Sequence, residues 1–216
     1  MSKITFESLF ESFKIDNKIY HIYDMVSIIK ITNKQIEILF ENIDQELKDF
    51  FFINLFRYPH NTLDTIIFTI QLGANPRTQD DQALINLCSS TVSLENNFEI
   101  MESTISKINF LINEIGANVN TQNSSPLGNS IPNKILINTL FNFGALITDF
   151  VIDSLVEVLD NQFLYIRCIE TIPIFINHGL DMQYLAQKFI FYDDQIKGIM
   201  KFFKKYDVNF DIILNT

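Results

Sequence analysis

Leu72-Gly73-Ala74-Asn75 returns later in the chain as Ile115-Gly116-Ala117-Asn118, and shorter matches follow as FGAL at 143–146 and HGLD at 178–181. In each case an apolar stretch with helical spacing runs directly into a glycine. Glycine commonly ends a helix because it enters the left-handed backbone conformation without a steric clash from a Cβ atom. Four helix ends of one kind are therefore predicted, at Gly73, Gly116, Gly144 and Gly179.

A leucine follows the first three of these glycines at a constant distance of eleven residues. The three leucines are Leu84, Leu127 and Leu155. A short polar segment, typical of a turn, separates the first two glycines from their leucines, and the third copy keeps the same register. Such self-similarity predicts an internal repeat, in which one helical unit is stacked on the next.

The pattern resembles the ankyrin repeat, in which a helix pair ends in Gly-Ala-Asp and a turn leads to Thr-Pro-Leu-His. Ser125-Pro126-Leu127 matches that opening best, because Ser can cap a helix and Pro suits its first turn. The glycines are spaced irregularly, at 43, 28 and 35 residues, against about 33 in the family, and the turns are about three residues shorter. The family's His is replaced in every copy, by Ile85, Gly128 and Val156.

The resemblance implies an all-α fold: an ankyrin-like helical repeat stack with short turn fingers and a helical N-terminal cap. We assign residues 1–60 to the cap and residues 61–216 to the degenerate repeats. Strand is expected only in the turn fingers or at 19–31. An unrelated all-α domain is the alternative fold.

Several local expectations follow from helical periodicity. Met101, Ile105, Ile108, Ile112 and Ile115 should form the buried stripe of one long helix. Residues 89–97 should form a polar loop inserted before it. A cap at Thr171 should place Pro173 in a first turn and split the segment 162–178 into two helices. Near the C-terminus, Tyr206 should take the place of the repeat glycine.

Composition narrows the function classes. The formal net charge is −10, from 16 Lys and Arg against 26 Asp and Glu. Nucleic-acid binders usually carry the opposite balance, so no nucleic-acid partner is expected. No apolar run is long enough for a membrane span and no signal peptide is apparent, which predicts a cytoplasmic protein without a membrane partner.

The source can be inferred only from composition and resemblance. Ile, Asn, Phe and Lys are abundant while Ala, Gly and Pro are scarce, as AT-rich codons produce. A chain that combines this bias with degenerate ankyrin-like repeats resembles the ankyrin families of giant DNA viruses of amoebae. The location would then be the host cytoplasm. An AT-rich protist or an intracellular bacterium would show the same bias.

The sequence contains no phosphate-binding loop, nucleophile elbow or paired metal-ligand spacing. Cys88 and Cys168 are far apart and are expected in the core, and the three histidines are isolated in sequence. We therefore expect no enzymatic activity, no cofactor and no metal. An enzyme whose catalytic groups are distant in sequence remains a third possibility.

The resemblance implies a non-catalytic protein–protein interaction module, acting as an adaptor or a host-factor binder. Its binding surface would consist of turn tips and the helix faces beside them. Most of these side chains are acids or amides, which implies a protein partner with a basic surface. The alternative is a structural or virion-assembly scaffold that self-associates. The candidate partner-binding residues are Arg77, Gln79, Asp80, Asp81, Gln122, Asn123, Ser124, Asp149 and Asp153.

Overall fold

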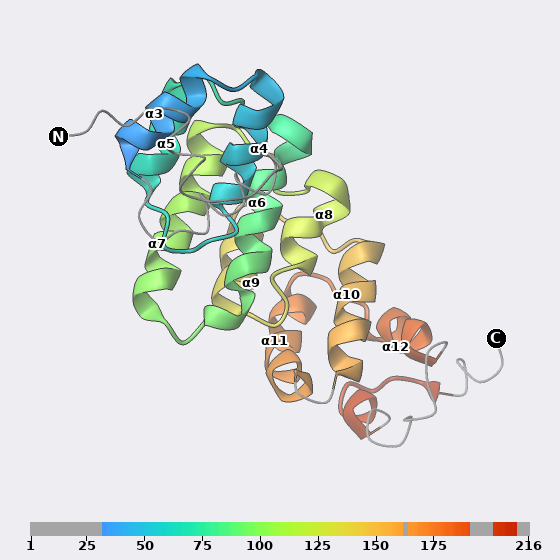
Figure 1. The fold of residues 1–216 in the computed structure, drawn as a ribbon. Helices are drawn as coiled ribbons and strands as arrows, with labels where there is room; N and C mark the ends of the chain where they lie inside the picture. The colour runs from blue at the N-terminus through green and yellow to red at the C-terminus, as the bar shows by residue number, and fades with distance from the viewer. Residues whose placement is uncertain (1–31, 162–163, 191–200, 211–216) are drawn as a thin grey trace.

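The computed structural model describes residues 32–161, 164–190 and 201–210, and every regular element in these ranges is helical (Figure 1). The absence of strand from the described ranges confirms the predicted all-α class. The sequence also predicts an amphipathic helix at 5–13, a helix or strand at 19–31, and closing contacts from Ile212, Ile213 and Leu214. These three predictions lie outside the described residues.

Ten α-helices are bounded within the described ranges, with two short irregular turns. The α-helices are α3 (Asn33–Glu41), α4 (Gln45–Leu55), α5 (Leu63–Gln71), α6 (Thr78–Thr91), α7 (Phe98–Asn109), α8 (Thr121–Gly128), α9 (Lys134–Asn142), α10 (Asp149–Asp160), α11 (Tyr165–Asn177) and α12 (Met182–Ile190). A 3₁₀ turn, η1 (Val92–Leu94), follows α6, and a π-helical turn, η2 (Phe110–Glu114), continues α7.

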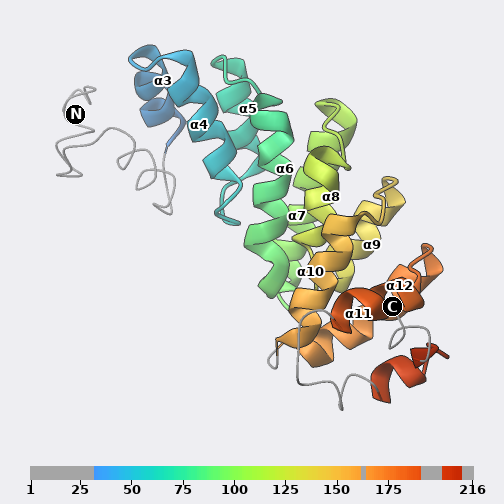
Figure 2. The same cartoon turned by 90° about the vertical axis from the view of Figure 1, so that its right-hand side faces the viewer.

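The helices form two rows. Contacts connect α4, α6, α8, α10 and α12 in one row, which we call the even row, and α3, α5, α7, α9 and α11 in the other, the odd row. Each even helix also packs against the odd helix that follows it in the chain, from α4 with α5 to α10 with α11. Figure 2 shows the resulting elongated array. The described part of the assigned cap, α3 and α4, continues both rows.

The four predicted helix ends are confirmed. Gly73, Gly116, Gly144 and Gly179 have φ of 99°, 77°, 83° and 93°, and each follows a helix of the odd row. After Gly144, the Ala145 N–H donates to the Leu140 carbonyl at 3.0 Å, which closes the helix end. A fifth turn of this kind was predicted at Tyr206, but the left-handed residue is Asp207, with φ of 55°. Asp is one of the few residues other than Gly that tolerate this conformation.

One hydrogen bond recurs between neighbouring turns. Two residues after four of the left-handed residues, a backbone N–H donates to a side-chain oxygen from the even row or its lead-in. The pairs are Asn75 N to Asp49 Oδ1 at 2.8 Å, Asn118 N to Asp81 Oδ2 at 2.9 Å, Leu146 N to Asn120 Oδ1 at 2.7 Å and Asn209 N to Gln183 Oε1 at 2.9 Å. The first three acceptors lie in or just before α4, α6 and α8, and the donors lie after α5, α7 and α9. Each bond therefore connects the start of a helix pair to the turn that follows that pair.

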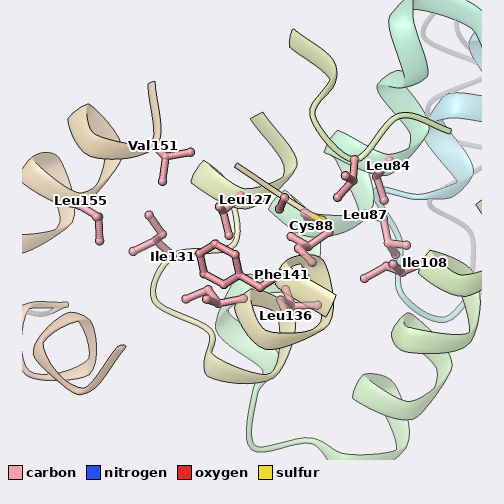
Figure 3. Packing of buried hydrophobic residues seen from close by; sticks show 14 of the residues in the cluster. Leu84, Leu87, Cys88, Ile108, Leu127, Ile131, Leu136, Phe141, Val151 and Leu155 are labelled. Atoms are coloured by element: carbon pink, nitrogen blue, oxygen red, sulfur yellow. The ribbon is translucent and has the colours of Figure 1, made fainter. Parts of the chain in front are cut away.

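The repeated leucines lie in the core between the rows. Leu84, Leu127 and Leu155 are each fully buried, on α6, α8 and α10 respectively. Figure 3 shows Leu84 on the side of Ile108 of α7, Leu127 near Leu136 of α9, and Leu155 beside Val151, so that side chains of both rows contribute to one apolar core. The equal spacing of the leucines thus reflects equivalent positions on successive even-row helices.

The residue after Leu127 is a glycine, and packing around α8 gives a steric reason for it. A Cβ atom at Gly128 would lie 2.5 Å from the Phe150 ring and 2.9 Å from Ser154 Oγ. The residue after Leu127 therefore lies where α8 approaches α10 closely, and no side chain fits there without a shift of Phe150.

The buried stripe of α7 differs from the predicted one. Met101 and Ile108 are buried as expected, but Ile105, Ile112 and Ile115 are only partly buried. Thr104, Lys107 and Leu111 complete the buried face instead. The predicted loop at 89–97 is also mostly helical, because α6 continues to Thr91 and η1 follows it directly.

The predicted split at Pro173 is wrong, because α11 is continuous through this residue. Thr171 does not cap a helix, since its buried hydroxyl donates to the Cys168 carbonyl at 2.7 Å. Pro173 lies on the exposed side of α11, whereas Ile172 and Phe175 are fully buried. The free energy gained by burying Ile172 and Phe175 offsets the loss of the backbone hydrogen bond that Pro173 cannot donate.

We expect Gly144→Ala to lower the free energy of unfolding by about 1 to 2 kcal/mol, because an L-residue is disfavoured at positive φ. Nothing lies within 4 Å of the added Cβ atom, so the loss is conformational and not steric. Gly144→Asn should lose less, since Asn tolerates this conformation. Urea unfolding of the three proteins measures the difference, and an Ala variant as stable as the parent would contradict the expectation.

Candidate partner-binding surface

Two turns that contain predicted site residues share an unusual backbone. Gln79, Asp80 and Asp81 have φ of 51°, 51° and 62°, and Gln122, Asn123 and Ser124 have φ of 44°, 61° and 62°. Three consecutive left-handed residues are costly for L-amino acids, so contacts around each turn must hold it in place. Thr121 provides one such contact, because its hydroxyl donates to the Asp80 carbonyl of the neighbouring turn.

These turns expose only some of the predicted residues. Gln79, Asp80, Gln122 and Asn123 are exposed, as a binding surface requires. Asp81 is 2% exposed and Ser124 is 0% exposed, so both must be removed from the predicted surface. The Ser124 hydroxyl contacts Asn120 Oδ1 at 3.0 Å, within its own turn. A polar residue in a turn need not face solvent when the next turn covers it.

Asp81 connects two turns through its carboxylate. It forms an ion pair with Arg77, four residues before it, and accepts the Asn118 N–H at 2.9 Å from the following turn. Arg77 itself is partly exposed, and its guanidinium also lies beside Gly116. Both residues were predicted to contact a partner. Asp81 is buried and connects adjacent turns instead, whereas Arg77 is accessible and stays a predicted binding residue.

The two predicted acids on α10 are exposed and bound by α12. Asp149 Oδ1 accepts the Tyr184 hydroxyl at 2.8 Å, and Asp153 Oδ1 accepts from Lys188 Nζ at 3.1 Å. The hydrogen bond to Asp149 raises the pKa of Tyr184, and the hydrogen bond to Asp153 raises the pKa of Lys188. Asp149 and Asp153 therefore lie on the exposed face of α10, but α12 already occupies one oxygen of each carboxylate.

Further along the same face lies a groove that sequence reasoning missed. It has a volume of about 330 Å³ and is lined by Phe150, Asp153, Ser154, Val156, Glu157 and Asp160, and we call it the α10 groove. The side chains of Glu157 and Asp160 are exposed and have no hydrogen bond or ion pair within residues 32–161, 164–190 and 201–210. The spacing of Asp149, Asp153, Glu157 and Asp160 by three or four residues was the available signal.

The cysteines lie in the core. Burial raises the pKa of Cys88 to about 12 and that of Cys168 to about 12, so both thiols are neutral at pH 7 and poor nucleophiles. Within the part of the chain that the structure describes, no three His, Cys, Asp or Glu side chains meet to form a metal site, and no helix there is long and apolar enough to span a membrane.

Lys107 is a buried cation near the loop between α4 and α5. It is 1% exposed, and its Nζ donates to the Pro59 carbonyl at 2.8 Å. Burial lowers the pKa of Lys107 to about 8. Burial and the charge of Lys107 also lower the pKa of His60, which follows Pro59. Burial therefore lowers the pKa of both groups, although neither belongs to the candidate surface.

We expect Asp81→Ala to destabilise the fold by about 2 kcal/mol, since it leaves the Asn118 N–H without its charged acceptor. Asp80→Ala is the matched control, because Asp80 also has positive φ but its side chain is exposed. Both changes share the backbone cost, so the difference between them isolates the buried carboxylate. Thermal and urea unfolding measure it, and equal losses would show that the Asp81 contacts contribute nothing.

We expect the Lys107 ammonium to make stability depend on pH between about 8 and its unfolded-state pKa near 10.4. In this window the unfolded state binds more protons, so the free energy of unfolding rises with pH. Lys107→Met should remove this contribution, so that the variant gains less stability between pH 8 and pH 10. The variant should also raise the pKa of His60, which proton NMR can follow. Parallel pH profiles for the two proteins would contradict the expectation.

Comparisons of this chain with protein-family models, with curated proteins and with solved structures found no match.

Proposed function

We propose that the chain is a non-catalytic protein-interaction module built as a degenerate ankyrin-like stack. Three observations support the ankyrin-like part: two rows of neighbouring helix pairs, a left-handed residue after each odd-row helix from α5 to α11, and a recurring hydrogen bond between turns. The repeat assignment, the viral source and the cytoplasmic location come from the resemblance and remain predictions.

The α10 groove is the observation that carries the proposed function. A floor of Phe150 and Val156 offers apolar contact, while the carboxylates of Glu157 and Asp160 supply charge at the surface. Apolar contact contributes affinity when water is displaced, and exposed charges contribute specificity and association rate. The groove therefore suits a protein segment that carries one apolar side chain between Lys or Arg residues.

The exposed turn residues extend this surface along the even row. Gln79 and Asp80 lie in the first turn of α6, and Gln122 and Asn123 lie in the first turn of α8, as Asp149 is the first residue of α10. The Gln122 amide also donates to the Gln79 carbonyl at 3.2 Å, so the two turns present their polar groups in a fixed arrangement. A fixed surface loses less conformational entropy on binding than a flexible one.

Charge reversal in the α10 groove tests the proposal. A random peptide library displayed on phage should yield basic segments with an apolar residue, and fluorescence anisotropy then gives the affinity of a selected peptide. We expect Glu157→Lys with Asp160→Lys to weaken binding at least about tenfold, because it converts attraction to repulsion. Thermal stability should change little, since both side chains are exposed.

The matched control is Glu37→Lys with Glu41→Lys on α3, which changes the net charge equally on two exposed side chains. It should alter affinity by less than about twofold at physiological salt, where distant charges are screened. Equal weakening in both variants would mean that only net charge matters. Selection of peptides without basic residues would contradict the proposed partner chemistry.

A further inference from the structure

A second surface lies at the other end of the odd-row helices from the turns. Phe98, Ile135 and Ile166 are 81%, 36% and 68% exposed, and they occupy the first or second position of α7, α9 and α11. These helices are neighbours in the odd row. We call the three side chains the apolar edge. With helix axes about 8 to 10 Å apart, the edge is roughly 20 Å long.

Ion pairs and hydrogen bonds join the three helix starts. Glu95 accepts the Lys134 N–H at 2.9 Å and pairs with Arg167 at 3.0 Å. Lys134 Nζ also pairs with Glu170 at 2.6 Å. The charged side chains beside the apolar edge are therefore already paired with one another. A partner that covers them would not leave a basic group unpaired.

The charge around the apolar edge differs from that of the whole chain. Lys134 and Arg167 nearly balance Glu95, Glu99 and Glu170, whereas the chain carries a formal net charge of −10. Two copies of such an acidic chain repel each other over most of their surface. The net charge around the apolar edge is close to zero and its exposed apolar area is high. Two copies of this edge therefore repel each other little and can bury apolar surface against each other.

We propose that the apolar edge is a self-association surface that binds a second copy of this chain in a two-fold, antiparallel dimer. In a two-fold interface the same patch meets itself, so Ile135 lies against Ile135 at the axis and Phe98 lies against Ile166. This pairing also brings the Glu99 end of one copy to the Arg167 end of the other. The surface is separate from the α10 groove, so either can fail without the other.

The edge is small compared with a stable dimer interface, so the dimer should be weak, with a dissociation constant on the order of 10 µM. Sedimentation velocity on the full chain between about 1 and 200 µM spans that range. We expect the parent protein to shift from monomer to dimer with concentration, and added salt to favour the dimer by screening the net charge.

Three variants that each add one negative charge locate the interface. Phe98→Glu and Ile166→Glu should weaken dimerisation at least about tenfold, because each buries an unpaired charge. Both lie in the first turn of a helix, where Glu is favourable, so the fold should persist. Leu146→Glu is the control, because Leu146 is 60% exposed but lies beyond the opposite end of α9 from Ile135.

Oxidative cross-linking tests the two-fold axis. Ile135→Cys should form a disulfide-linked dimer, while Leu146→Cys should not. Cys88 and Cys168 are buried, so they should not react in either sample. A parent protein that stays monomeric to about 200 µM would overturn the proposal. It would also be overturned by a dimer that Leu146→Glu weakens equally, or by one that Ile135→Cys fails to cross-link.

Discussion

The hydrogen bond between consecutive turns sets the geometry of the array. A left-handed residue follows each odd-row helix from α5 to α11, and Asp207 adopts the same conformation near the C-terminus. Two residues after four of these five residues, a backbone N–H would lack a partner without a side-chain acceptor. Asp49, Asp81, Asn120 and Gln183 each supply an oxygen for such an N–H. A short polar side chain can reach only a neighbouring turn. The bond therefore fixes the distance and direction between successive helix pairs, and the even-row helices begin where these turns place them.

Side chains that make this bond need not be identical, which explains why the repeat is difficult to recognise. An aspartate, an asparagine and a glutamine all present an oxygen acceptor, so substitution among them preserves the contact. The left-handed position is similarly tolerant, because Asp207 adopts it as Gly73 does. The irregular spacing is absorbed elsewhere: the unit of 43 residues contains the longer α6, η1 and the π-helical turn η2. The geometry of the turns is thus conserved from one turn to the next, although their amino acids differ.

The helix ends at the glycines and the buried leucines were predictable from sequence, because single residue types satisfy these constraints. The continuity of α11 was not, since Pro173 has a local preference to break a helix that burial of Ile172 and Phe175 outweighs. The burial of Asp81 was also missed, although Arg77 four residues earlier signals a possible pair. The α10 groove depends on which face of α10 its neighbours leave uncovered, and sequence spacing alone does not determine that face.

The contacts of the two rows have a consequence for how the chain folds. Helix pairs meet mainly their neighbours along the chain, so most contacts join residues that are close in sequence. A fold of this kind has low contact order and need not close large loops before it gains packing energy. Folding can begin at the contact between the central helices α8 and α10 and extend toward both ends, while the terminal pairs open first when stability falls. Hydrogen-exchange protection should therefore decline from the middle of the array outward.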